Sequence, residues 1–261
     1  MMDIGVAGRH AIICGGSRGI SRAAADRLAA EGARVTLVAR TAATLEQVAA
    51  EIAAATGAEV SFVATDLTSP EGRAHLIAER PAADILVTNA GVPQRPIPYR
   101  ELDREEWIRW FDAHFFSAID LIHAYAPGMC DRRFGRIVNV SANFIKFPQI
   151  GVGHSHAARL ALAGAIASLV REVAPFNVSI NSILPGLIDT EALRDALGQR
   201  AKAKGVTYET VEAEVRKRTA AGRLADPKEA GDLIAMLCAA QMGYVTGQNI
   251  VNDGGAFEGL F

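Results

Sequence analysis

A glycine-rich stretch near the N-terminus has the residue types and spacing to bind a phosphate. It runs Cys14-Gly15-Gly16-Ser17-Arg18-Gly19-Ile20, after apolar residues 10–14 and before a helical pattern over residues 21–31. Glycines permit a tight turn and a close approach of the backbone to an anion. The start of a helix adds unpaired N–H donors and a partial positive charge. The pattern is short, so an ordinary strand–helix turn is the alternative interpretation.

An alternation of strands and helices predicts where this turn lies. Apolar or β-branched runs predict strands at residues 10–14, 34–39, 60–64, 84–88, 136–140, 178–184 and 248–252. Helical patterns cover residues 45–55, 105–129 and 153–173, and begin at two capping signals, Ser69-Pro70 and Asp226-Pro227. Nearly continuous apolar strands separated by helices predict a parallel sheet covered on both faces, which binds ligands beyond the carboxyl ends of its strands.

Length and composition indicate one domain without a polyanionic or membrane partner. The 261 residues are 50% hydrophobic and carry a net charge of −2, so residues 1–261 are predicted to form a single domain that binds no nucleic acid. No apolar run approaches the roughly 20 residues of a membrane span. The cysteines are three and far apart, which predicts reduced thiols in a cytoplasmic protein and no metal site. A charged helical insertion, residues 187–222, is predicted to be a substrate lid.

The motifs in this order resemble those of the short-chain dehydrogenases/reductases over nearly the whole chain. The glycine turn matches that family's phosphate loop, although Ser21 stands where a third glycine is often found. The other matching segments are Asp66-Leu67 (adenine contact), Asn89-Ala90-Gly91 (a structural motif), Pro185-Gly186 with Ile188 and Thr190 (nicotinamide carboxamide) and Asn252-Asp253-Gly254-Gly255 (end of the last strand).

The resemblance implies a Rossmann-type α/β fold, a single doubly wound parallel sheet of about seven strands. It also implies a nicotinamide dinucleotide as cofactor, a small-molecule substrate, and a homotetramer or homodimer formed through the helix at residues 153–173. The cofactor-binding residues that it implies are Gly15, Ser17, Arg18, Gly19, Ile20, Arg40, Asp66, Leu67, Asn89, Ala90, Gly91, Arg159, Pro185, Gly186, Ile188 and Thr190.

The residue after the second strand indicates which dinucleotide is bound. A carboxylate at this place would accept hydrogen bonds from a ribose 2′-hydroxyl and repel a 2′-phosphate. The chain has Ala39 and then Arg40 there, and Arg18 in the glycine turn offers a second guanidinium. Two forked donors suit a phosphomonoester, so NADP(H) is predicted in preference to NAD(H). The alternative is two solvated surface arginines.

The catalytic positions depart from the pattern of the family. The resemblance places the family's Tyr-x-x-x-Lys pair on Ser155-His156-Ala157-Ala158-Arg159 and its serine on Ala142, beside Ser141. The family's asparagine falls on His114. Ser155 is an alcohol of very high pKa and is a poor substitute for a phenol as proton donor. Arg159 stays protonated, so it holds a positive charge at the cofactor ribose but does not shuttle protons.

Histidine is the side chain whose proton is most available near neutral pH, and three histidines are predicted near this cleft. His156 should point away from Ser155 by about 100° along the helix, and His154 is favoured only if the helix begins there. His114 is therefore the preferred proton donor, in a catalytic set of His114, Ser155, Arg159 and Ser141. A structural role is the alternative for each histidine.

Three functions remain open from the sequence. The first is an NADP(H)-dependent oxidoreductase that acts on a carbonyl or alcohol through a non-standard proton relay. The second is a dinucleotide-binding protein without redox activity, a sensor or assembly partner, which the replaced catalytic residues favour. The third is a non-redox lyase or dehalogenase, which the arginine at position 159 favours and the retained dinucleotide motifs disfavour.

Overall fold

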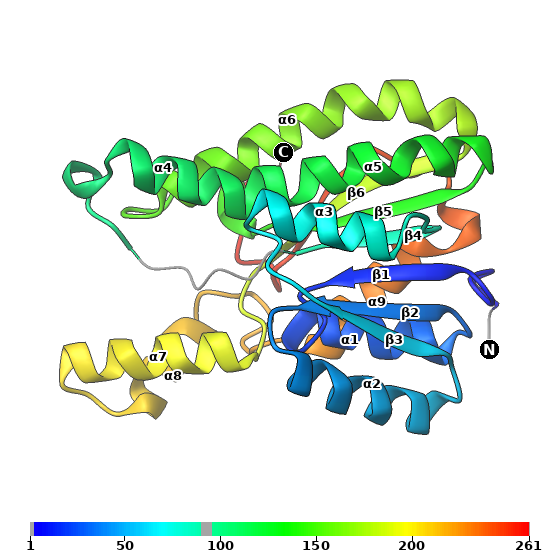
Figure 1. Cartoon of the computed structure of the whole chain (residues 1–261). Coiled ribbons are helices and arrows are strands. Elements are labelled where there is room, and N and C mark those ends of the chain that lie inside the picture. Colours follow the sequence, from blue (N-terminus) through cyan, green and yellow to red (C-terminus); the bar gives the residue numbers. More distant parts are fainter. Residues whose placement is uncertain (1–2, 90–95, 261) are drawn as a thin grey trace.

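The chain folds around one parallel β-sheet, as the sequence predicts. The computed structural model describes residues 3–89 and 96–260, so Ala90 and Gly91 of the predicted cofactor motif lie outside the described residues. The sheet has seven parallel strands in the order β3-β2-β1-β4-β5-β6-β7 (Figure 1). The strands are β1 (His10–Cys14), β2 (Arg34–Ala39), β3 (Val60–Ala64), β4 (Ile85–Thr88), β5 (Gly135–Val140), β6 (Val178–Pro185) and β7 (Asn249–Asn252).

Helices cover both faces of the sheet. One face packs against α1 (Gly19–Ala30), α2 (Ala42–Thr56) and α9 (Pro227–Cys238), through a core that includes Leu28, Leu45 and Ile234. The other face packs against α3 (Pro70–Glu79), α5 (Ser117–Asp131) and α6 (Gly153–Val173), through residues that include Leu76 and Leu121. Figure 1 shows these two layers above and below the strands. Because both faces are covered, strands β1, β4, β5 and β6 are buried along nearly their whole length.

The capping signals in the sequence have the predicted structures. The Ser69 hydroxyl accepts a hydrogen bond from the Gly72 N–H at the start of α3. Asp226 and Glu229 form a reciprocal capping box at the start of α9. In both helices a proline occupies the first turn, where no N–H partner is needed.

The long helix predicted over residues 105–129 is interrupted. It consists of α4 (Arg104–Phe111), a π-helical segment η2 (Asp112–Phe116) and α5. The Ser117 hydroxyl donates a hydrogen bond to the Ala113 carbonyl at 2.7 Å, which satisfies an acceptor inside the wide turn. The apolar periodicity continues through such a turn, so the sequence pattern does not reveal it.

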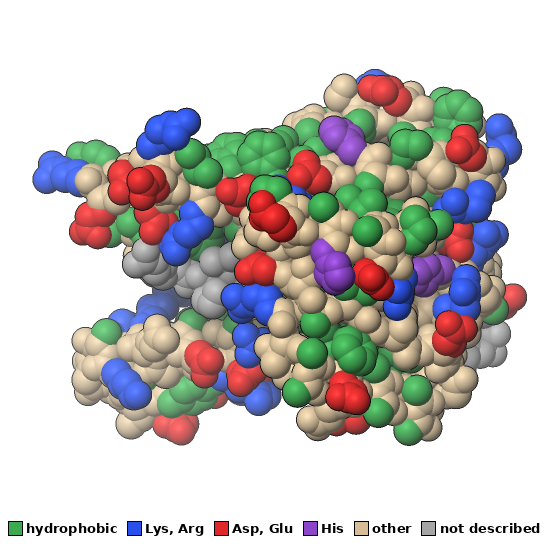
Figure 2. Space-filling model, in the orientation of Figure 1, with side chains coloured by type: hydrophobic (Ala, Val, Ile, Leu, Met, Phe, Trp, Pro, Cys, Tyr) green, Lys and Arg blue, Asp and Glu red, His purple; other side chains and the backbone are tan. Residues whose placement is uncertain are grey.

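The charged insertion forms two helices beside the sheet, α7 (Glu191–Lys204) and α8 (Tyr208–Arg216). They pack on each other through a small apolar cluster of their own, which includes Leu197, Val211 and Val215. Figure 2 shows the molecular surface hollowed between this pair and the α4 region. The insertion thus lies at one side of the hollow where the predicted lid would be.

Candidate active site

The residues predicted to bind a cofactor follow the carboxyl ends of neighbouring strands. Gly15 follows β1, Arg40 follows β2, Asp66 lies just beyond β3, Asn89 follows β4 and Gly186 follows β6. In a parallel sheet these strand ends lie along one edge, so the fold brings together residues that are far apart in the sequence. The change in strand order between β1 and β4 places the glycine turn at the point where ligands of such sheets bind.

The glycine turn has the conformation that a phosphate site requires. Gly15 and Gly19 have φ values of +68° and +61°, which favour glycine. The Gly15 N–H donates to the Val38 carbonyl at 2.8 Å, which holds the turn against β2. Helix α1 begins at Gly19, and its N-cap residue, Arg18, makes no side-chain capping hydrogen bond. The first N–H groups of α1 are therefore available to an anion such as the pyrophosphate of a dinucleotide.

Ser21, which stands where a third glycine is often found in the family's phosphate loop, fits at this position of the turn. Its side chain is fully buried, and its hydroxyl accepts a hydrogen bond from the Asn89 side-chain amide at 2.9 Å. This contact joins the first turn of α1 to the end of β4. Asn89 therefore supports the glycine turn through its side chain, a role that the sequence alone did not indicate.

The two arginines predicted to recognise a 2′-phosphate differ in their contacts. Arg40 is exposed and makes no ion pair or side-chain hydrogen bond with any residue in the described ranges 3–89 and 96–260. Arg18 forms an ion pair with Glu191, with 2.7 Å between Arg18 Nη1 and Glu191 Oε2. Both partners of that pair are largely exposed, and such pairs contribute little free energy. Arg40 is thus free to bind an anion. Arg18 would first have to break its ion pair with Glu191.

The other predicted cofactor segments are fixed by local hydrogen bonds. In the adenine-side loop (residues 66–69), Asp66 Oδ1 accepts hydrogen bonds from the N–H and hydroxyl of Thr68. The Thr190 hydroxyl caps α7 by accepting from the Leu193 N–H, and its methyl carbon would lie 3.3 Å from a Cβ on Gly19. After β6, Gly186 packs so closely that a Cβ there would lie 2.5 Å from the Asp253 Cβ. Pro185 ends β6, and Ile188 is buried.

Ser155 and Arg159 lie one helical turn apart on α6 and contact each other. Arg159 Nε donates to Ser155 Oγ, and Arg159 Nη1 donates to the Val140 carbonyl at the end of β5, both at 3.3 Å. Burial lowers the pKa of Arg159 to about 10, so the guanidinium is cationic at neutral pH. No carboxylate among the described residues forms an ion pair with it. The pair can therefore offer hydrogen bonds from a fixed positive charge.

His114 is buried beside this pair, in the π segment η2. Desolvation, with the nearby Arg159 and His154, lowers the pKa of His114 to about 2. The imidazole is therefore neutral at neutral pH and carries no extra proton to donate, which argues against the proton-donor role predicted for it. Its Nε2 atom has no hydrogen-bond partner among the described residues, and neither has the buried Ser141 Oγ. Both atoms are available to a ligand or a water.

The other two histidines have different surroundings. His154 is fully buried and packs against Trp110, with 4.3 Å between ring centroids, and Trp110 also lies 5.3 Å from His114. His156 is half-buried and lies near Phe144, with 6.5 Å between ring centroids. The structure thus places His114 and His154 around one indole ring, while His156 faces another side of α6.

Comparisons with known proteins identify the family. A family model described as short chain dehydrogenase matches residues 9–201. The chain belongs to the short chain dehydrogenase family. It is 32% identical over 254 residues to the 3-oxoacyl-[acyl-carrier-protein] reductase FabG of Escherichia coli, an alignment that covers 96% of this chain and 98% of that protein.

Solved structures of this family match nearly the whole chain. The L-sorbose reductase of Gluconobacter frateurii, complexed with NADPH and L-sorbose, superimposes with a TM-score of 0.92 at 30% identity, covering 99% of this chain and all of that one. YwfH, an NADPH dependent reductase involved in bacilysin biosynthesis, gives a TM-score of 0.89 at 25% identity, covering 97% of this chain and all of that one. Across residues 3–89 and 96–260, no helix has the length and apolarity to cross a membrane.

None of the four tyrosines of this short chain dehydrogenase, all of which lie in the described residues, is hydrogen-bonded to Ser155 or Arg159. The Tyr125 hydroxyl donates to the Arg80 carbonyl, and the Tyr99 hydroxyl accepts from Arg100. Tyr208 lies in the α8 helix of the insertion, and Tyr244 is fully exposed. In this structure no phenol contacts the Ser155–Arg159 pair within the described part of the chain.

The buried neutral His114 predicts a pH dependence of stability. The unfolded chain binds a proton at this histidine below about pH 6.5 and the folded chain only near pH 2, so the free energy of unfolding rises with pH between these values. We expect the wild type to lose about 2 kcal/mol of unfolding free energy between pH 7.5 and pH 5. The variant His114→Asn, which installs the amide that the resemblance assigns to this position, should not show this loss.

Urea unfolding at several pH values would measure this difference. His10, whose pKa is also lowered chiefly by burial, is present in both proteins and cancels from the comparison. Parallel pH dependences for the wild type and the variant would contradict the assignment.

Proposed function

We propose that the chain is an NADP(H)-dependent oxidoreductase that interconverts a carbonyl and an alcohol on a small molecule. The observation that carries this proposal is the open anion site at the start of α1, with Gly15 and Gly19 in left-handed conformations and no side-chain cap at Arg18. The left-handed glycines let the backbone of the turn approach an anion closely, and the first N–H groups of α1 are then available to it. The NADPH-containing L-sorbose reductase, which shares the fold over its whole length, supports the same cofactor class.

The chain's own residues would hold the dinucleotide in three places. The N–H groups from Ser17 to Ile20 would bind the pyrophosphate. The adenine-side loop and Asn89 would border the adenosine, and Ala90 and Gly91 remain part of this prediction. Pro185, Gly186, Ile188 and Thr190 would border the nicotinamide, and Arg159 would contact its ribose.

Preference for NADP(H) follows from charge at the end of β2. Arg40 offers a guanidinium that has no partner among residues 3–89 and 96–260, at the place where a carboxylate would bind an unphosphorylated ribose. A phosphomonoester would satisfy that charge through two hydrogen bonds. Arg18 would join it after leaving Glu191, which costs little free energy because the pair is exposed.

The catalytic residues would act by binding and orientation, with a proton relay that differs from that of the family. When bound, the nicotinamide supplies or accepts the hydride. Ser155, whose Oγ accepts a hydrogen bond from the Arg159 cation, would donate its hydroxyl proton in a hydrogen bond to the substrate oxygen. His114 Nε2 and Ser141 Oγ would hold a water, and a proton from solvent would pass through that water to the substrate oxygen, so that the water is restored.

A second function is favoured by the same residues. The two titratable side chains of this centre have pKa values of about 2 and about 10, both far from neutral pH. General acid catalysis is most effective when the pKa lies near the working pH. A dinucleotide-binding protein without redox activity, a sensor or assembly partner, is therefore the competing proposal.

The remaining predictions concern organisation. We propose one domain over residues 1–261 with residues 187–222 as the substrate lid, acting in the cytoplasm as a homodimer or homotetramer. The separate apolar cluster between α7 and α8 supports a lid that moves as a unit.

Titration of the purified protein with NADPH and with NADH tests the proposal first. We expect micromolar binding of NADPH and much weaker binding of NADH, followed by turnover in a screen of carbonyls and alcohols. In that screen, His114→Ala should lose activity while keeping its affinity for NADPH. Binding of NADPH without turnover would favour the redox-inactive protein, and binding of neither cofactor would exclude both functions.

A further inference from the structure

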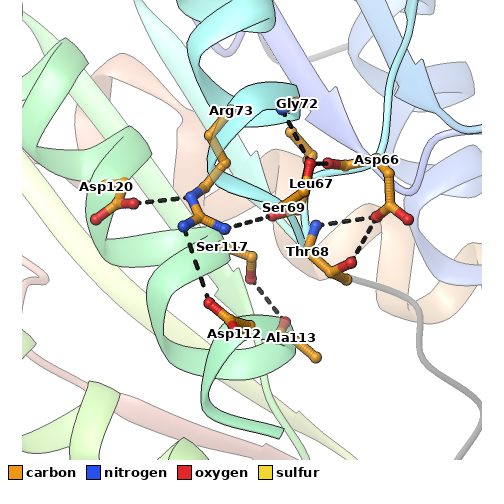
Figure 3. A network of polar contacts seen from close by, with 10 residues as sticks. All are labelled: Asp66, Leu67, Thr68, Ser69, Gly72, Arg73, Asp112, Ala113, Ser117 and Asp120. Carbon is orange, nitrogen blue, oxygen red and sulfur yellow. Dashed lines mark hydrogen bonds and ion pairs between the residues drawn. The ribbon is translucent and has the colours of Figure 1, made fainter. Parts of the chain in front are cut away.

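A buried arginine joins the adenine-side loop to the segment that carries His114. The side chain of Arg73, on α3, is only 5% exposed. Its Nε donates to Asp120 Oδ2 at 2.7 Å, and its Nη1 donates to the Leu67 carbonyl at 3.1 Å. Its Nη2 lies 3.9 Å from Asp112 Oδ1. Figure 3 shows the guanidinium between the loop on one side and the helical segments on the other.

Each contact of Arg73 lies at a position relevant to the proposed site. Leu67 belongs to the Asp66-Leu67 pair, so the guanidinium binds the backbone of the adenine-side loop directly. Asp112 is the first residue of the π segment η2, and His114 follows two residues later in the same segment. Asp120, on α5, anchors the cation from one turn beyond the end of η2.

The backbone hydrogen bonding of the π segment η2 explains why a contact with Arg73 would help to hold it in place. A π turn lacks the regular i to i−4 ladder of the flanking helices, and such turns occur frequently at functional sites. Charge-assisted hydrogen bonds fix Arg73 to Asp120 and to the Leu67 carbonyl, and the ion pair with Asp112 at 3.9 Å attracts η2 to the cation held in this way. At the surface, a groove of about 280 Å³ is lined by Thr68 of the adenine-side loop, by α4 and by Asp112, so the loop and η2 border the same groove.

We propose that Arg73 is a positioning residue that couples the adenine-side loop to η2, so that a dinucleotide bound at the loop fixes the position of His114. The inference rests on the proposed function for its ligand, but the link itself is a property of the free protein. Arg73 would act on His114 through Asp112 and without contact to the cofactor or substrate.

Hydrogen–deuterium exchange of the full chain tests this coupling without any substrate. In Arg73→Gln we expect the amides of residues 66–69 and of residues 112–116 to exchange at least about tenfold faster, while the β-strands keep their protection. In the wild type, saturating NADPH should slow exchange in both segments. In Arg73→Gln, NADPH should slow exchange in residues 66–69 only.

Three further variants separate positioning from general stability. Asp112→Asn keeps the contacts of Arg73 with Leu67 and Asp120, so it should free residues 112–116 alone. Arg73→Lys keeps the charge and one donor, and should restore part of the NADPH-dependent protection. Arg27→Gln is the matched control, because Arg27 also pairs with two carboxylates, Glu31 at the end of α1 and Asp232 on α9, and these helices cover the opposite face of the sheet from α3.

Three results would overturn the proposal. The first is unchanged exchange at residues 112–116 in Arg73→Gln. The second is NADPH-dependent protection of residues 112–116 that persists in that variant. The third is an increase in exchange spread evenly over the chain. If NADPH does not bind the wild type, the proposed function fails, and the exchange pattern of the free proteins alone still tests the link.

Discussion

Arg40→Asp is expected to reverse the cofactor preference of this short chain dehydrogenase. The substitution replaces an exposed cation at the end of β2 with a carboxylate, which would accept hydrogen bonds from a ribose 2′-hydroxyl and repel a 2′-phosphate. The dissociation constant for NADPH should rise on the order of a hundredfold, because a charge-assisted contact is lost and a repulsion is added. The dissociation constant for NADH should stay constant or fall.

Calorimetric titration of the two cofactors against each variant would measure this change. Arg34→Asp is a matched control, since Arg34 lies at the opposite end of the same strand and is also exposed. Equal changes for NADPH and NADH in Arg40→Asp would mean that Arg40 does not contact the 2′-phosphate. An effect of similar size in Arg34→Asp would assign the change to net charge instead.

Gly15→Ala is expected to abolish tight dinucleotide binding and to destabilise the fold. Gly15 has a φ of +68°, and a Cβ there would lie 2.9 Å from the Asn89 carbonyl oxygen. The backbone atoms of Asn89 end a buried strand and cannot move away easily. We expect a loss of about 2–3 kcal/mol in unfolding free energy, from left-handed strain and overpacking together, and a rise in the NADPH dissociation constant of at least about a hundredfold.

Gly8→Ala gives the matched control for this substitution. Gly8 has a φ of +71°, but no atom lies within 4 Å of its Cβ position, so it reports the left-handed strain alone. Denaturant unfolding and NADPH titration of both variants would separate the two contributions. If Gly8→Ala and Gly15→Ala lose equal stability and both bind NADPH normally, the close approach at Gly15 has no functional role.

The sequence by itself determined the sheet and the elements around it. Apolar runs indicate the buried parallel strands, and N-cap residues such as Ser69 and Asp226 indicate where helices begin. Both signals lie within a few residues of the sequence. The family motifs then located the residues at the carboxyl ends of the strands. The glycine turn was predictable for the same reason, because the left-handed conformation at Gly15 and Gly19 depends on the residues themselves.

Only the tertiary structure decided the protonation and the ion pairs of the side chains at the site. The sequence suggested His114 as a proton donor, but its pKa depends on burial in the folded chain and on the charges of Arg159 and His154, which lie on another helix, α6. The π segment leaves the apolar pattern unchanged, and the ion pair between Arg18 and Glu191 joins residues that lie 173 positions apart.

Arg73 illustrates the same limit most clearly. In the sequence it is one arginine of a polar helix, next to a capping serine and a proline. Its burial against Leu67, Asp112 and Asp120 arises only when α3 packs beside α5. Local patterns encode which elements form, whereas pKa values, ion pairs and coupling between segments depend on distances that the folded chain alone establishes.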